Sequence, residues 1–212
     1  MRKIFLTAIV ALIMSVQSLC GAAEVYSDFF HDEENLIYPV VRTGDKAIDK
    51  KINGAIVAEI DRFLSGVYLT AQEINAEIAD MRTNFEVPCN RAGDTVILSL
   101  VITESNYYTG GAHPATYKHA LNFNLANGEI IDLDYLTDVG EGIPKDYLIE
   151  KLTQRLREYR ERKGTYLFDD ALPLKELPQD FYWDDKLNLH FIFQHYQIAP
   201  YAAGIIDVEL ED

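Results

Sequence analysis

The stretch that most constrains the fold is residues 107–117, which read Tyr-Tyr-Thr-Gly-Gly-Ala-His-Pro-Ala-Thr-Tyr. It separates two runs of strand-forming residues, 95–103 and 117–125, so the chain turns back on itself here. The Gly-Gly pair permits positive φ angles, and Pro114 holds His113 in an extended conformation. We therefore predict two antiparallel strands joined by a loop whose conformation the glycines and Pro114 define. On spacing alone a purely structural hairpin is favoured, because isolated histidines are seldom catalytic.

The N-terminal residues 1–23 are typical of a secretory signal peptide. Two basic residues precede an apolar run that is too short to span a bilayer, and small residues end the segment. We expect cleavage between Ala23 and Glu24, and hence a periplasmic or extracellular protein. This interpretation is favoured over a retained anchor. It is also favoured over lipid attachment at Cys20, because Leu19 is not the small residue that a lipoprotein signal requires.

Cleavage would leave 189 of the 212 residues and take the net charge from −15 to −17. A chain of this length forms one compact domain, or two small ones that share a core. The acidic charge argues against nucleic acid and anionic membranes as partners and favours a basic protein, although it also serves solubility. Cleavage would leave Cys89 as the sole cysteine, so no internal disulfide can form in the mature chain. With Arg91 as its only nearby cation, we interpret Cys89 as structural.

Hydrophobic periodicity predicts an α+β fold, in which antiparallel sheets with strand meanders and hairpins pack against about three helices. Two neighbouring helices are expected at residues 45–65 and 70–82, the first ending at Gly66 and the second opening with a capping box. A third helix is expected at residues 144–163. The expected strands cover residues 25–31, 36–42, 84–88, 94–108, 117–125, 129–133, 181–183, 187–194 and 205–211, with irregular segments at 134–142, 172–178 and 195–203.

No motif supplies a nucleophile, a set of metal ligands or a phosphate-binding loop. His113, His119, His190 and His195 lack the spacing of a metal motif, and the serine-elbow and Walker patterns are missing. The many acidic residues make any single carboxylate pair uninformative. We therefore expect no catalytic residue, metal or cofactor, and we favour a binding protein. The alternative is an envelope hydrolase or metal-dependent enzyme that uses His113 with a carboxylate.

Aromatic residues give the better indication of function. Tyr107, Tyr108, Tyr117, Tyr196 and Tyr201 gather around the two irregular stretches. Exposed aromatic rings stack on sugars and anchor protein interfaces, whereas buried ones fill the core beneath a loop. The sequence therefore predicts that some of these rings form a recognition surface.

Two segments resemble the paired hallmarks of the RsiV-type extracytoplasmic domain. They are Tyr-Thr-Gly-Gly-Ala-His-Pro at residues 108–114 and Tyr-Gln-Ile-Ala-Pro-Tyr-Ala-Ala-Gly at residues 196–204. That domain is the outer part of a lysozyme-sensing anti-sigma factor and the N-terminal part of some peptidoglycan deacetylases, and it also occurs alone in exported bacterial proteins. Residues 24–106 are similar to the domain that usually precedes it, and residues 107–212 to the RsiV-type half.

The resemblance implies an α+β fold and a binding role in the cell envelope, with lysozyme or a peptidoglycan-like glycan as the partner. Sigma-factor signalling and deacetylation do not carry over, because the chain shows no sigma-binding segment, internal transmembrane helix or deacetylase domain. The oligomeric state stays open. The binding residues expected are Tyr108, Thr109, Gly110, Gly111, His113, Pro114, Tyr196, Pro200 and Tyr201.

Overall fold

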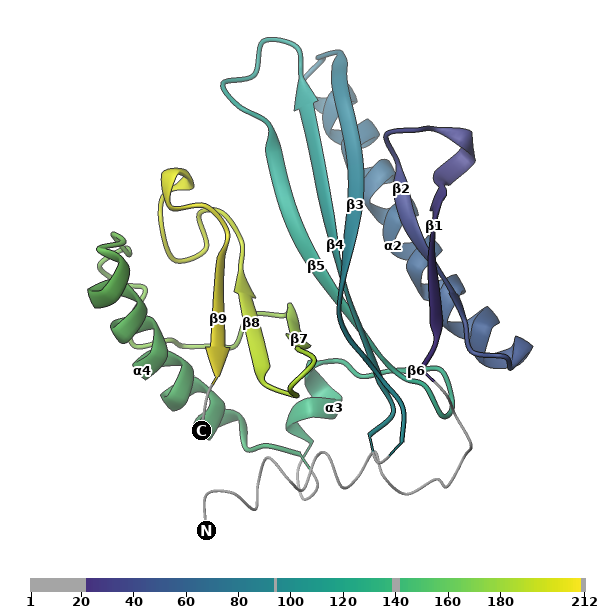
Figure 1. The fold of residues 1–212 in the computed structure, drawn as a ribbon. Coiled ribbons are helices and arrows are strands. Elements are labelled where there is room, and N and C mark those ends of the chain that lie inside the picture. The colour runs from purple at the N-terminus through teal and green to yellow at the C-terminus, as the bar shows by residue number, and fades with distance from the viewer. Residues whose placement is uncertain (1–21, 94, 139–141, 211–212) are drawn as a thin grey trace.

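Three antiparallel sheets and three α-helices make up the described part of the chain, which is residues 22–93, 95–138 and 142–210 of a computed structural model (Figure 1). The predicted α+β class is confirmed. The predictions for residues 1–21, including Cys20, lie outside the described residues. Within those residues, none of the helices combines the length and apolar character needed to cross a bilayer.

The predicted opening hairpin is confirmed. Strand β1 (Glu24–Phe29) pairs antiparallel with β2 (Ile37–Arg42) around the short 3-10 helix η1 (Phe30–Asp32). Helix α2 (Lys46–Glu73) follows, and the Asp45 side chain caps it by accepting from two backbone N–H groups of its first turn. Its buried residues recur at helical spacing and form one apolar face: Ile52, Ile56, Ile60, Phe63, Val67 and Ala71.

The predicted break at Gly66 and the predicted second helix at residues 70–82 are wrong. Helix α2 continues through Gly66 and Thr70 to Glu73, so the capping-box pattern at Thr70 lies inside a helix. The chain leaves the helix at Asn75, whose φ of 49° is in the left-handed region. A polar side chain tolerates that conformation, which commonly ends a helix.

Strand β3 (Ile78–Arg91) begins where the predicted second helix was to continue. Ile78 lies opposite Tyr108 and Met81 opposite Asn106 in the antiparallel ladder with β4 (Ile97–Tyr108). Eleven residue pairs thus join β3 to β4 from one end of β4 to the other, with register shifts between Ile78 and Asp80 and between Glu86 and Cys89. This long-range pairing outweighs the short apolar spacing that, read locally, also fits a helix.

The four-stranded sheet has the order β3-β4-β5-β6, with β5 (Ala115–Asn124) and β6 (Glu129–Ile130) as its later strands. The predicted Asn-Gly hairpin between β5 and β6 is confirmed, and Gly128 takes a φ of 71° there. β6 is shorter than predicted, because Asp132 caps a short helix α3 (Leu133–Thr137) where irregular structure was expected. The expected division at residues 106 and 107 falls inside β4.

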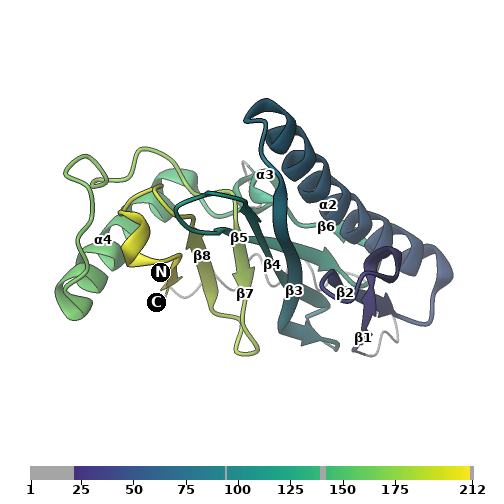
Figure 2. The ribbon, with the colours of Figure 1, turned by 90° about the horizontal axis from the view of Figure 1, so that it is seen from above.

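The C-terminal part adds helix α4 (Lys145–Lys163) and a sheet of β7 (Phe181–Trp183), β8 (Leu189–Phe193) and β9 (Ile206–Leu210). The predicted third helix and the predicted hairpin of β7 and β8 are confirmed. Figures 1 and 2 show α4 packed along the three-stranded sheet, while α2 lies across the four-stranded one.

A buried polar network joins the two larger sheets. The Ser99 hydroxyl donates to Asn122 Oδ1 over 2.7 Å, and the Asn122 amide donates to the carbonyl of Phe181 over 2.7 Å. The backbone N–H of Trp183 donates in turn to the Ser99 hydroxyl. Ser99 and Asn122 are both buried, so each bond satisfies a group that water does not reach.

The outward edge of β5 meets side chains of the C-terminal part. Gln194 accepts from the N–H of Lys118 and donates to the carbonyl of the same residue, and the N–H of Ala120 donates to Asp180. Gln194 also donates to Asp180 over 2.9 Å. These contacts hold the residue before β7 and the residue after β8 against the four-stranded sheet.

Candidate functional site

The two loops singled out in the sequence meet in space. One connects β4 to β5, and the other connects β8 to β9 and contains the 3-10 helix η2 (Tyr201–Ala203). Both lie at the same end of their sheets, the upper end in Figure 1. We call the surface formed by residues 107–114 and 195–201 the loop-pair surface.

Three stacked rings form the centre of the loop-pair surface. The ring of Tyr201 lies 3.7 Å from that of His113 and 4.3 Å from that of His195, with interplanar angles of 25° and 22°. Tyr196 stands beside the stack, with its ring centroid 5.9 Å from that of Tyr201. Its side chain is 58% exposed. The surface therefore offers aromatic faces that the fold already holds in place.

The carbonyl of Pro114 fixes this stack. It accepts from the Tyr201 hydroxyl over 2.9 Å and lies 2.9 Å from His113 Nδ1. The Tyr196 hydroxyl lies 3.5 Å from His113 Nε2. These contacts fit an imidazole that donates through Nδ1 and accepts at Nε2. Both ring nitrogens are thus engaged by the loops themselves.

The glycines shape the first loop. Gly110 has a φ of 86°, and the N–H of Gly111 donates back to the carbonyl of Tyr108. A Cβ atom on Gly111 would lie 3.1 Å from that carbonyl oxygen and 3.3 Å from the Tyr107 ring. Gly110 therefore allows the positive φ of the turn, and the absence of a side chain at Gly111 lets the Tyr107 ring approach the backbone closely.

The structure brings some predicted binding residues together and separates others. His113, Pro114, Tyr196 and Tyr201 contact one another, and Pro200 directly precedes η2. Thr109, Gly110 and Gly111 form the exposed tip of the first loop, and the Thr109 N–H donates to the carbonyl of Glu77. Tyr108 points elsewhere, because its hydroxyl donates to the carbonyl of Val67 on α2.

A second cluster, which the sequence analysis missed, lies between α2 and the four-stranded sheet. We call Glu59, Glu104 and His119 the His119 cluster. His119 Nε2 lies 3.6 Å from Glu104 Oε2, and His119 Nδ1 lies 3.8 Å from Glu59 Oε1. Arg62 bonds both carboxylates, at 2.6 Å from Glu59 and 3.3 Å from Glu104. Asp180 Oδ1 lies 3.4 Å from His119 Nδ1.

Burial dominates the electrostatics of the His119 cluster. Glu104 is 1% exposed, and burial raises its pKa to about 7, with repulsion from Glu59 added and attraction to His119 and Arg62 opposing. Burial acts to lower the pKa of His119. The hydrogen bond and charge of Asp180, with the charges of Glu104 and Glu59, raise that pKa overall.

A groove of about 330 Å³ opens beside the His119 cluster. Arg62, Glu104 and His119 border it, as do the aromatic side chains of Tyr108 and Tyr117. Tyr108, predicted for the loop-pair surface, thus belongs to this groove instead. The groove places titratable groups beside apolar rings, the usual make-up of a ligand site.

Two groups of described residues have ligand atoms close enough to hold a metal ion. One is the His119 cluster, and the other is Asp184, His190 and Glu209. In the second group His190 Nδ1 already lies 3.0 Å from Asp207 Oδ1, and the Tyr182 ring stacks on His190. The expectation of no metal came from sequence spacing, which does not reflect distances between different elements.

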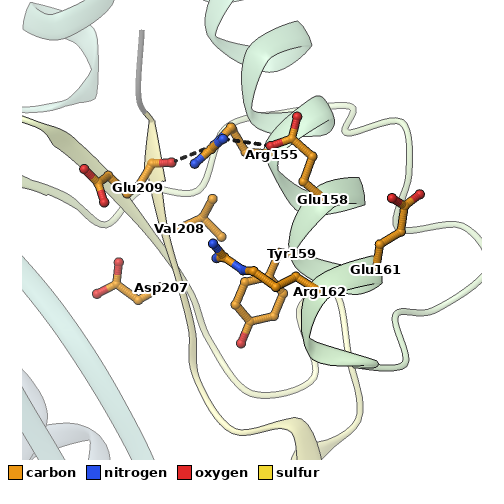
Figure 3. A pocket seen from close by; sticks show the side chains of 8 residues that line it. All are labelled: Arg155, Glu158, Tyr159, Glu161, Arg162, Asp207, Val208 and Glu209. Carbon is orange, nitrogen blue, oxygen red and sulfur yellow. Dashed lines mark hydrogen bonds and ion pairs between the residues drawn. The ribbon is translucent and has the colours of Figure 1, made fainter.

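A second hollow, of about 540 Å³, lies between α4 and β9 (Figure 3). Arg155 donates there to the carbonyl of Glu209 and to the carboxylate of Glu158. Figure 3 shows Arg162 extending over Tyr159 toward β9. The hollow combines acidic and basic side chains, and neither predicted binding loop contributes to its lining.

Comparison with known proteins bears on the fold. Residues 135–211 match DUF3298, a family described as a protein of unknown function. A solved DUF3298 structure from Pseudomonas aeruginosa PAO1 superposes with a TM-score of 0.59 at 11% identity and covers 91% of each chain. One from Bacteroides fragilis NCTC 9343 gives 0.54 at 17% identity, covering 88% of this chain and 87% of the other. No curated protein matches. At these identities the solved structures establish a shared fold.

Proposed function

We propose that the chain is a non-catalytic, exported binding protein of the cell envelope, and that its loop-pair surface recognises lysozyme or a peptidoglycan-like glycan. The observation that carries the proposal is the stack of Tyr201 between His113 and His195, which unites the two motif loops in one surface. A loop used only as a connection needs no such partner from another sheet.

The chemistry of the loop-pair surface favours recognition. The hydroxyls of Tyr196 and Tyr201 contact the first loop, so these two side chains contribute ring faces to a partner. Aromatic residues that are held rigid lose little conformational freedom on binding, and they dominate interface energies. Such rings stack on sugars and equally seat protein side chains.

The choice of partner rests on the resemblance of the two loops to the RsiV-type domain. The net charge of −15 adds support, because lysozyme is strongly basic and opposite charges accelerate encounter. Charge alone gives weak binding that salt removes, since the Debye length falls to about 3 Å at 1 M salt. The aromatic rings would supply the part of the affinity that survives salt.

An enzyme built on His113 is the weaker alternative. Among the described residues, no carboxylate forms an ion pair with His113, whose two nitrogens face Pro114 and Tyr196. A general base needs an open position within hydrogen-bond reach of a substrate proton. The geometry therefore favours binding over hydrolysis at this histidine.

Calorimetry tests the proposal. The purified protein is titrated with hen egg-white lysozyme and, separately, with soluble peptidoglycan fragments, at low salt and at about 1 M salt. We expect one of the two to bind, with affinity that is partly retained at high salt. Tyr196→Ala and Tyr201→Ala should each weaken binding by more than about tenfold.

Tyr26→Ala is the matched control, because Tyr26 is 44% exposed on β1 and belongs to a different sheet. It should bind as the wild type does. Binding that falls equally in all three variants would move the contact surface away from the loops. A folded wild-type protein that binds neither probe at either salt would refute the proposal.

A further inference from the structure

We propose that Glu59, Glu104 and His119 bind a divalent transition-metal ion, of which zinc fits the ligand set best. Zinc in proteins is bound by histidine nitrogen and carboxylate oxygen at about 2.0–2.2 Å. One ligand atom from each of the three residues lies within 4.8 Å of the others. The inference concerns a site separate from the loop-pair surface and does not depend on the proposed function.

The geometry of His119 already suits a metal ligand. Asp180 Oδ1 lies 3.4 Å from Nδ1, nearer than Glu59 Oε1 at 3.8 Å, so Asp180 favours a proton on Nδ1 and leaves Nε2 on the opposite side of the ring to bind the ion. Nε2 lies 3.6 Å from Glu104 Oε2. Two ligands of one tetrahedral zinc are roughly 3.4 Å apart. A carboxylate that orients a ligating histidine through its other nitrogen is the usual outer contact of a zinc site.

Glu104 supplies an independent reason to expect a cation. Its side chain is 1% exposed, and among the described residues no hydrogen-bond donor meets its Oε1 atom. A buried carboxylate oxygen without a donor is unfavourable unless a cation or proton offsets the lost hydration. Glu104 also borders the groove of about 330 Å³, so an ion can reach it.

Arg62 is the competitor for this position. Its guanidinium bonds Glu59 and Glu104, but its side chain is 54% exposed and can rotate into solvent. Three protein ligands would leave a fourth position of the ion open toward the groove, where Asn106 and Tyr117 also lie. The open position would accept water or an oxygen donor of a small ligand.

Zinc binding to the EDTA-treated protein tests the proposal by calorimetry, and the visible spectrum of added Co²⁺ reports the coordination. We expect one ion per chain. Glu104→Gln and His119→Gln should each lower the affinity by at least about tenfold, because each removes a ligand. Arg62→Met should raise it by about tenfold, because it removes a competing cation.

His190→Gln is the control for the other candidate group, Asp184, His190 and Glu209, and it should leave the affinity unchanged. Tyr196→Ala should also leave it unchanged, which separates this site from the loop-pair surface. Circular dichroism checks folding, and Glu59→Gln on the partly exposed face of α2 serves if Glu104→Gln does not fold. No binding of zinc or cobalt by the wild type would overturn the inference. Unchanged affinity in Glu104→Gln and His119→Gln, or loss of binding in His190→Gln, would overturn it as well.

Discussion

The ring of Tyr201 lies 3.7 Å from the ring of His113, and the two planes are inclined by only 25°, although the residues come from loops of different sheets. Their contact joins the end of the four-stranded sheet to the end of the three-stranded one. It is reinforced where the Tyr201 hydroxyl donates to the carbonyl of Pro114. The contribution of this contact to the stability of the protein can be measured directly.

A double-mutant cycle should detect the stack. His113→Ala and Tyr201→Ala are expected to be non-additive, with a coupling of about 0.5–1.5 kcal/mol in the free energy of unfolding, because stacked aromatic pairs are worth this much beyond area burial. Chemical denaturation of the wild type, both single variants and the double variant gives the value. His113→Ala with Tyr26→Ala should be additive. Additivity in the first cycle would show that the rings do not stabilise each other.

The positive φ in the first loop should appear in stability. Gly110→Ala is expected to lower the free energy of unfolding by about 1–2 kcal/mol, because the backbone there has a φ of 86°, which is unfavourable for alanine. Nothing lies within 4 Å of the new Cβ, so the loss would come from the backbone conformation and not from a clash. Gly54→Ala in helix α2, also without neighbours, should raise stability by about 0.5–1 kcal/mol. Thermal and urea denaturation provide the comparison. Equal effects of the two changes would argue against a left-handed conformation at Gly110.

The buried network between the sheets should be sensitive to Asn122. Asn122→Ala is expected to cost about 2–4 kcal/mol of stability, because it leaves the Ser99 hydroxyl and the Phe181 carbonyl without their partner. Asn35→Ala, at an exposed position, should change stability by less than about 0.5 kcal/mol. Urea denaturation measures both. A small loss at Asn122 would mean that water replaces the amide and that the junction is more open than the structure has it.

The thiol of Cys89 should impose a pH dependence on stability. Burial raises its pKa to about 11, from an ordinary value near 9. The folded state therefore binds this proton more tightly than the unfolded state. The associated stability is complete below pH 9 and is lost as the pH rises through 11.

Cys89→Ala removes that contribution. The stability difference between wild type and variant should shrink by up to about 2–3 kcal/mol between pH 8 and pH 11. At pH 8 the native thiol should react with a thiol reagent only after denaturant is added, because Cys89 is buried. A constant difference across the pH range, or rapid reaction of the native thiol, would contradict the raised pKa.

Much of the fold was predictable from local patterns. The Asn-Gly turn at Gly128 and the helix that ends at Gly164 are set by residues within a few positions of each other. The boundary between α2 and β3 was not predictable in this way. The apolar residues around Ile78 are compatible with either a helix or a strand. The pairing of Ile78 with Tyr108 on β4 determines that this segment is a strand.

The same distinction between local sequence pattern and tertiary packing applies to the candidate sites. His113 and Tyr201 lie in loops rich in turn-forming residues, so local chemistry indicated them. Glu104 and His119 are two positions apart across the ladder of β4 and β5, since Glu104 lies opposite Tyr117. That register, and the approach of Glu59 from α2, follow from tertiary packing and have no signature in the spacing of residues.

The contacts of Gln194 and Asp180 with β5 have a consequence for how the protein behaves at high concentration. An outer strand with free N–H and C=O groups is a template on which another molecule can add a strand, and this is how aggregation and domain swapping begin. Here the N–H and carbonyl of Lys118 are taken by one amide side chain, and the N–H of Ala120 by a carboxylate. β6 pairs with β5 only at Phe123 and Asn124, so these side chains occupy hydrogen-bonding groups on the part of β5 that β6 leaves unpaired. They hinder the addition of a further strand there without forming one themselves.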